Sequence, residues 1–170
     1  MSNHTHHCHH HDVYHDHDPK ARLEEARHHC VLKGVRFTLL REQVYELILT
    51  ADKPMGAYDL ISALQAKRQD DANNTSKNIA PPTVYRSLEF LLEEGLIHQL
   101  NSINAYIPCC HPRSAHAAAF LICTDCHKVE ECSNLPVQSI LDFATQDANF
   151  QVERTIIELK GLCHDCQKNH

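Results

Sequence analysis

The chain has 170 residues, including 16 histidines and nine cysteines, and a formal net charge of -6 at pH 7. No apolar run approaches the roughly 18 residues that cross a membrane, and the first residues lack the apolar segment of a secretion signal. We therefore expect a cytoplasmic metal protein rather than a secreted disulfide scaffold, with no membrane partner.

The first 18 residues form a low-complexity tract that contains eight histidines and Cys8. Such a segment cannot bury a core, so residues 1–18 are expected to form a disordered tail. Its many imidazoles favour weak additional zinc binding, and a passive tail is the alternative.

Four helices are expected in the next part of the chain, where acidic and basic residues are balanced. The first covers residues 20–33 and ends at Gly34, a C-cap signal. Thr38 is an N-cap for the second helix, and the third covers residues 57–66. A polar loop at residues 67–80 separates the third helix from the fourth.

The fourth helix is expected to begin at Pro81-Pro82-Thr83, because proline suits a first helical turn. Its buried stripe consists of Val84, Leu88, Leu91 and Leu92. A period of about 3.6 residues places on the opposite side Thr83, Arg86, Phe90 and Glu93. Gly95 ends the helix, and two strands are expected at residues 96–100 and 105–107.

Three helices, a fourth helix and a hairpin, in this order, predict a winged helix-turn-helix domain at residues 19–108 that binds double-stranded DNA. In this domain Arg86 would contact a guanine edge or a phosphate, and Thr83 a phosphate. The alternative for Arg86 is a solvated surface charge. Tyr58 would contact the DNA backbone or a thymine methyl group, or would be a half-buried anchor.

Residues 109–170 predict a small α/β domain, so that the fold class of the whole chain is α+β. Strands are expected at residues 117–122, 128–131 and 150–159. A helix at residues 137–148 is expected to turn inward Ile140, Leu141 and Ala144. The domain is too small to bury much surface by itself, so we expect zinc and self-association to stabilise it.

The strongest chemical signal is a pair of CxxC motifs, Cys123-Thr-Asp-Cys126 and Cys163-His-Asp-Cys166. Each tight turn can offer two sulfurs to one ion, and two turns complete the tetrahedral S4 shell of a structural Zn²⁺. Redox-active or idle thiols are the alternative. Because a closed S4 shell leaves no coordination position open, the site does not point to a zinc enzyme.

A second group of possible ligands is mixed and consists of His98, Cys109 or Cys110, His111, His116 and Glu131. A mixed tetrahedral zinc shell would be formed by His98, Cys109, His116 and Glu131. Taken singly, each is also an ordinary surface histidine, buried thiol or solvated carboxylate. A metal held by both domains would fix one against the other and so link zinc to DNA affinity. Four further residues are not expected to be ligands, Cys30, Cys132, His127 and His164, although Cys132 is close enough to compete.

Several segments together resemble the ferric-uptake-regulator family, and in particular its zinc-uptake regulator branch. The resemblance covers about residues 21–166. It rests on the runs from Gly34 to Arg41, Ala57 to Leu60, Pro81 to Gly95, Leu96 to His98, Asn104 to Cys109 and His116 to Cys123, and on Cys126 and Gly161-Leu-Cys163-His-Asp-Cys166.

The resemblance implies a homodimeric transcriptional repressor that binds a palindromic operator when loaded with zinc and represses zinc-uptake genes. It implies two zinc ions per chain and no small-molecule substrate. The structural zinc would be held by Cys123, Cys126, Cys163 and Cys166. The regulatory zinc would be held by His98, Cys109, His116 and Glu131. The positions that match DNA contacts are Tyr58 and Arg86.

This chain departs from the family pattern in four places. The stretch after Cys109 is short, so Cys110 is an alternative ligand. Leu39 stands where the family has proline, the loop at 67–80 is longer, and the His-rich tail is unusual. The nearest alternative function is a sensor of iron, peroxide, manganese or nickel in the same family. Two alternatives of other classes are a zinc enzyme, and a zinc store that would not explain the winged helix.

Overall fold

The computed structural model describes residues 11–12, 18–69, 79–110, 112, 118–132, 137–152 and 155–168, with the backbone alone at 11, 12, 69, 118 and 138. The chain divides into two compact units, one of Val13–Arg113 and one of Met1–Asp12 with Ser114–His170. This division lies slightly beyond the boundary expected after residue 108. None of the described helices is long and apolar enough to cross a membrane.

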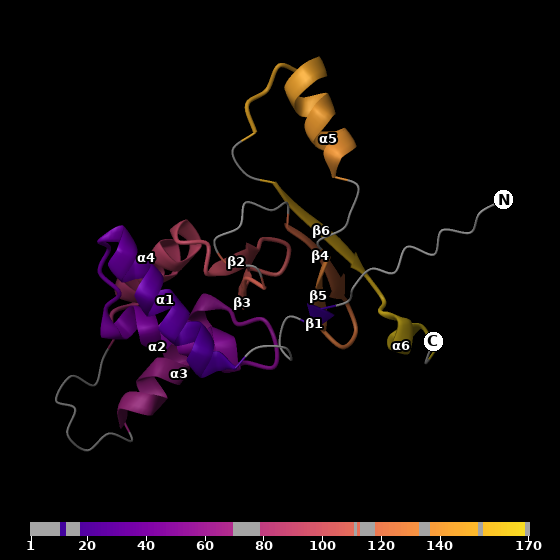
Figure 1. The fold of residues 1–170 in the computed structure, drawn as a ribbon. Helices are drawn as coiled ribbons and strands as arrows, with labels where there is room; N and C mark the ends of the chain where they lie inside the picture. Colours follow the sequence, from indigo (N-terminus) through magenta and orange to yellow (C-terminus); the bar gives the residue numbers. More distant parts are fainter. Residues whose placement is uncertain are drawn as a thin grey trace. The chain divides into compact units, whose positions relative to one another are not determined.

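The described residues of the first unit form four helices and a hairpin (Figure 1). Their bounds are α1 Pro19–Lys33, α2 Leu39–Thr50, α3 Ala57–Gln69, α4 Pro81–Glu93, β2 Ile97–Leu100 and β3 Ala105–Pro108. Strand β2 pairs antiparallel with β3, which gives the element order expected for a winged helix. Helix α3 continues past the expected end at residue 66, and residues 70–78 lie outside the described residues.

The ends of the first two helices follow the sequence signals. Gly34 has a positive φ of 67°, and its N–H donates to the carbonyl of Val31. Glycine adopts this left-handed conformation without a steric penalty. At the start of α2, the N–H of Arg41 donates to Oγ1 of Thr38 at 3.4 Å. These two caps fix the short connection that separates α1 from α2.

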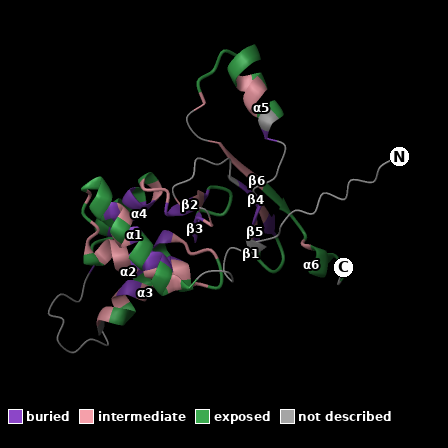
Figure 2. Cartoon of the chain, in the orientation of Figure 1, coloured by how far each residue is buried: buried purple, intermediate pink, exposed green. Residues whose placement is uncertain are grey.

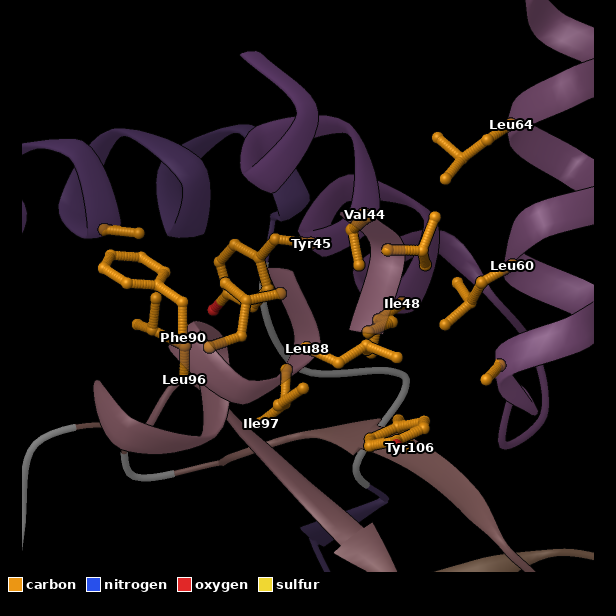
Figure 3. Packing of buried hydrophobic residues seen from close by; sticks show 14 of the residues in the cluster. Val44, Tyr45, Ile48, Leu60, Leu64, Leu88, Phe90, Leu96, Ile97 and Tyr106 are labelled. Carbon is orange, nitrogen blue, oxygen red and sulfur yellow. The ribbon is translucent and has the colours of Figure 1, made fainter. Parts of the chain in front are cut away.

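The core of this unit lies among α1, α2, α3, α4 and the hairpin, and part of it is seen in Figure 3. It includes Val44, Tyr45, Ile48, Leu60, Leu64, Leu88, Leu96, Ile97 and Tyr106. The prediction that Phe90 lies on the outward side of α4 is wrong. Phe90 is only 7% exposed and stacks on Phe37 with 6.2 Å between ring centroids. Because the segment before α2 also covers α4, the apolar surface of α4 is wider than one stripe.

The second unit is a mixed sheet with strand order β1-β5-β4-β6 (Figure 1). The bounds are β1 His11–Asp12, β4 Ala118–Cys123, β5 Val129–Cys132 and β6 Ile156–Gly161. Strand β5 is antiparallel to β4, whereas β6 is parallel to it. Two parallel strands need a long connection between them. Here the connection contains the α-helix α5, Gln138–Asp142, and directly after it the π-helix η1, Phe143–Asp147. The short helix α6, His164–Gln167, follows β6.

Two details of this unit differ from the sequence predictions. Strand β6 begins at Ile156 rather than at 150, because among the described residues the pairing with β4 starts at Ile156. Ile140 was expected to face inward but is 56% exposed, and most of α5 and η1 is exposed or half-buried (Figure 2). An amphipathic period alone does not show whether the same chain supplies a surface that covers the apolar side.

Residues 11–12 were expected to belong to a disordered tail, and this prediction is wrong for them. They form β1, in which His11 pairs with Glu131 and Asp12 with Glu130 of β5. An edge strand presents backbone groups with which another extended segment can pair. Residues 1–10 and 13–17 lie outside the described residues, so zinc binding by the tail stays a prediction.

Candidate metal centre and nucleic-acid interface

The parallel pairing of β4 and β6 brings the two CxxC motifs together. Cys123 ends β4 and pairs in register with Gly161, which ends β6, so both strands deliver a cysteine turn to the same edge of the sheet. The N–H of Thr124 donates to the carbonyl of Gly161 at 2.8 Å and ties the two turns. This pairing explains how cysteines far apart in sequence reach one site.

The four sulfurs form a compact cluster within this unit. The Sγ atoms of all four cysteines lie within 4.8 Å of one another. The backbone N–H of Cys163 donates to Sγ of Cys123 at 3.3 Å, and the sulfurs of Cys126 and Cys163 are 3.7 Å apart. The described cysteines form no disulfide. Four sulfur donors at this spacing fit a tetrahedral Zn²⁺.

The acidities of two of these thiols differ, for structural reasons. Backbone hydrogen bonds from Cys163 and Cys126 lower the pKa of the Cys123 thiol to about 6. A hydrogen bond to Asp125 and the neighbouring sulfurs raise the pKa of the Cys166 thiol. Four thiols this close need a counter-charge before all can ionise, and a divalent cation supplies it. The site therefore fits a metal better than a set of free thiols.

The hairpin of the first unit holds two of the four predicted regulatory ligands. His98 of β2 is opposite Ile107, and the N–H of Cys109 donates to the carbonyl of Leu96 at 3.0 Å, which extends the ladder by one residue. His98 and Cys109 are therefore diagonal neighbours on one face, at a typical separation of about 7–8 Å. Both are buried, whereas Cys110 is half-buried. An imidazole and a thiol on one face can share a zinc ion.

The other two predicted ligands belong to the second unit. Glu131 lies in β5 opposite Phe120 and is only 2% exposed, which is unusual for a carboxylate. His116 lies outside the described residues, as does His111. The convergence of the four ligands therefore stays a prediction. Cys30 and Cys132, which were not expected to be ligands, are buried.

Sequence reasoning missed Arg22, which lies on α1 and is only 7% exposed. Its Nη2 donates to the carbonyl of Cys109 at 2.5 Å and to the hydroxyl of Tyr45 at 3.3 Å. Burial raises the pKa of Tyr45, so this hydroxyl stays neutral and can accept the hydrogen bond. The available signal was the position of an arginine beside the apolar positions Leu23 and Ala26 on one helix.

The predicted DNA-contacting residues are all exposed within the first unit. Thr83 and Arg86 lie on α4, on the side away from the buried Val84 and Leu88. Tyr58, in the first turn of α3, is 76% exposed and therefore is not a half-buried anchor. Exposed basic and hydroxyl side chains on the fourth helix suit contact with a DNA groove.

The amino-acid sequence of this chain is similar to known proteins. Residues 32–160 match the model of the ferric uptake regulator family. The chain is 36% identical over 146 residues to the zinc uptake regulation protein of Escherichia coli strain K12. The aligned region covers 85% of this chain and 80% of that protein.

Solved structures show the same likeness. The structure of a zinc uptake regulator complexed with zinc and DNA has a TM-score of 0.77 at 32% identity, covering 91% of this chain and 98% of the other. The holo form of XcZur has a TM-score of 0.72 at 36% identity, covering 87% of this chain and 98% of the other.

Proposed function

The chain belongs to the ferric uptake regulator family, and from this premise we propose that it is a zinc-responsive transcriptional repressor rather than an enzyme. It binds operator DNA as a zinc-loaded homodimer in the cytoplasm and represses zinc-uptake genes. The observation that carries this proposal is the likeness to a zinc uptake regulator solved with zinc and DNA. The S4 cluster adds independent support for zinc.

Two zinc ions per chain are proposed, with different tasks. The S4 zinc at the ends of β4 and β6 is structural and would hold the two CxxC turns together. The second zinc would be regulatory and bound by His98, Cys109, His116 and Glu131. Its support is the shared hairpin face of His98 and Cys109, and the burial of Glu131. A bound divalent cation would supply positive charge to this mixed donor set.

Regulation would follow from differential zinc binding to two arrangements of the DNA-binding unit. Zinc at the second site would favour the arrangement in which the α4 helices of the two protomers fit consecutive major grooves. A coupling of about 1–3 kcal/mol corresponds to a change of about 5–150-fold in DNA affinity. On α4, Arg86 would read a guanine edge or bind a phosphate, and Thr83 would bind a phosphate. Tyr58 of α3 would contact the DNA backbone or a thymine methyl group.

The test measures zinc stoichiometry and DNA binding on the same preparation. A duplex selected by the zinc-loaded protein from a random library is titrated while free zinc is buffered upward. Because the tail can bind extra zinc, zinc is also counted on a protein that lacks residues 1–10. Two zinc ions in the shortened protein, and binding that appears as the second one is taken up, would support the proposal.

Single substitutions then identify the ligands of the second zinc. His98→Ala and Cys109→Ser should retain one zinc and lose the zinc response, whereas Cys110→Ser should behave as the unaltered protein. The reverse result for the two cysteines would assign Cys110 as the ligand. A His98→Ala protein that keeps both zinc ions and a normal response would contradict the proposed site.

The second candidate is a sensor of iron, peroxide, manganese or nickel. A thiolate ligand favours zinc over the harder ions, and for this reason zinc is preferred. DNA binding that ignores zinc but follows added Fe²⁺ or Mn²⁺, or is abolished by peroxide, would favour this candidate. For the His-rich tail we propose weak additional zinc binding, to be read from the difference in stoichiometry between the full and the shortened protein.

A further inference from the structure

Burying a cationic side chain inside a small domain costs free energy, because the charge is removed from water, so other interactions must offset this cost. Arg22 is such a residue: its side chain is almost fully buried in the first unit. Its Nη2 has two acceptors, whereas Nε has none among the described residues. Incomplete satisfaction of this kind points away from stability alone as the role of Arg22.

The first acceptor of Arg22 is the main chain of a proposed zinc ligand. The carbonyl of Cys109 accepts from Arg22 at 2.5 Å, and the N–H of Cys109 donates to the carbonyl of Leu96 at 3.0 Å. The peptide groups on both sides of the Cys109 α-carbon are therefore held. With the main chain held in this way, the rotamer of the buried side chain decides where the sulfur lies.

These bonds also connect Cys109 to three helices of the DNA-binding unit. Arg22 belongs to α1, and its second acceptor is the hydroxyl of Tyr45, a fully buried residue of α2. On the other side of Cys109, the N–H of Leu96 donates to the carbonyl of Leu91 in α4 at 2.9 Å. A continuous set of hydrogen bonds thus runs from α4 through Cys109 to α1 and α2.

We propose that Arg22 is a positioning residue for the regulatory zinc, which holds the Cys109 main chain in its metal-binding place and couples it to the helices that present the DNA-contacting residues. This inference rests on the proposed function, because it assumes that Cys109 binds zinc. Residues that orient a metal ligand without touching the metal commonly change metal affinity about 10–100-fold when removed.

Arg27 offers a matched control on the same helix. Its Nη2 donates to Oε2 of Glu42 at 2.8 Å, so Arg27 also joins α1 to α2. Among the described residues its hydrogen bonds go to Glu24 and Glu42 and not to Cys109. Arg27→Met therefore removes a charge and an ionic α1–α2 link while leaving the Cys109 main chain held.

The experiment compares Arg22→Met, Arg22→Lys and Arg27→Met in the full chain. The affinity for the second zinc is measured by competition with a chelator of known zinc affinity, and operator binding is measured in buffered zinc. Arg22→Met should bind the second zinc about 10–100-fold more weakly and retain the S4 zinc. Saturating zinc should restore its maximal operator binding. Arg22→Lys should recover part of the affinity, and Arg27→Met should stay within about twofold of the unaltered protein.

Three results would overturn the inference. One is an Arg22→Met protein with unaltered affinity for the second zinc, and another is an equal loss in Arg27→Met. The third is a single zinc on the unaltered protein lacking residues 1–10, which would remove the proposed regulatory site itself. If Arg22→Met does not fold, as judged by circular dichroism, Arg22→Lys and Tyr45→Phe decide instead, and unaltered zinc affinity in both would contradict the coupling.

Discussion

The guanidinium carbon of Arg41 lies 3.6 Å from the centroid of the Phe90 ring. Arg41 belongs to the first turn of α2, and its Nη1 also donates to the carbonyl of Arg36. Phe37 stacks on the same ring of α4. The segment at 36–41 thus covers Phe90 with an aromatic ring and a cation, and makes it part of the core instead of the DNA-facing side.

Replacing Phe90 with alanine should therefore reduce stability rather than remove a DNA contact. Loss of a buried phenylalanine typically costs about 3–5 kcal/mol, part of which is the cavity left behind. Thermal or urea unfolding of the zinc-loaded protein measures this loss. Glu93→Ala, an exposed change on the same helix, is the control and should have little effect. If Phe90→Ala kept its stability but bound the operator more weakly, Phe90 would have to be a DNA-contacting residue rather than a core residue.

Phe90 and Ile140 show where sequence reasoning reached its limit. Helical period correctly separated Val84 and Leu88 from Arg86, because these positions differ by well-defined angles around α4. It could not show that the 36–41 segment covers Phe90, or that no described part of the same unit covers Ile140. Coverage depends on contacts between distant segments, which local spacing does not contain.

The same limit explains why one of the two proposed metal sites was easier to predict from the sequence than the other. The S4 site could be predicted because each CxxC brings two donors together within one turn, and one strand pairing completes it. The proposed second site would need donors from distant segments of the chain, so no local pattern can fix it. Arg22 was missed because an arginine on a helix is most often solvated, and only its contact with Cys109 reveals its role.

Arg86 should contribute to operator affinity and very little to stability. Arg86→Ala is expected to weaken binding by about 1–3 kcal/mol if the side chain reads a guanine, with relaxed preference at one base pair. Arg86→Lys keeps the charge but loses the planar fork of donors, so it should restore only part of the affinity. Competition binding against single-base variants of the selected duplex measures both effects. Full recovery by lysine, with a reduced salt dependence in Arg86→Ala, would assign a phosphate contact instead.

Cys163→Ser should remove the structural zinc and destabilise the second unit. Three remaining sulfurs leave an incomplete shell, and metal binding in small domains contributes directly to folding. We expect one zinc fewer per chain and a lower melting temperature. Cys30→Ser changes a buried thiol of the first unit and should retain both zinc ions. A Cys163→Ser protein with unchanged zinc content and melting temperature would show that the four sulfurs do not share a zinc.

The exposed apolar residues of α5 and η1 should contribute to the homodimer. Ile140 and Phe143 are both largely exposed within the chain, and the proposed homodimer needs an apolar surface to bury. Introducing a charge with Ile140→Asp or Phe143→Asp should shift the protein toward monomer in analytical ultracentrifugation and weaken operator binding. Ser139→Asp, an exposed polar position of α5, is the control. Dimers that resist both apolar changes would place the interface elsewhere.

Glu94, at the end of α4, should make stability depend on pH. Its Oε2 lies 2.9 Å from Nε2 of His29 and 2.9 Å from Nζ of Lys33, so it joins α4 to the last turns of α1. Burial alone would raise the pKa of this carboxyl, but the hydrogen bonds and charges of Lys33 and His29 outweigh burial and lower it. Because the folded-state pKa is depressed, the ionised carboxylate stabilises the fold at neutral pH.

This stabilisation should be present above the ordinary carboxyl pKa of 4.5 and be lost as the pH falls through the lower folded-state value. Glu94→Gln should therefore be less stable than the unaltered protein at pH 7, by about 1–3 kcal/mol. The difference should shrink as the pH falls below 4.5. Urea unfolding of both proteins at matched pH measures the difference, because loss of zinc in acid affects both alike. Glu93→Gln, on the exposed side of α4, should show no such trend, and a constant difference for Glu94→Gln at every pH would contradict the ion-pair account.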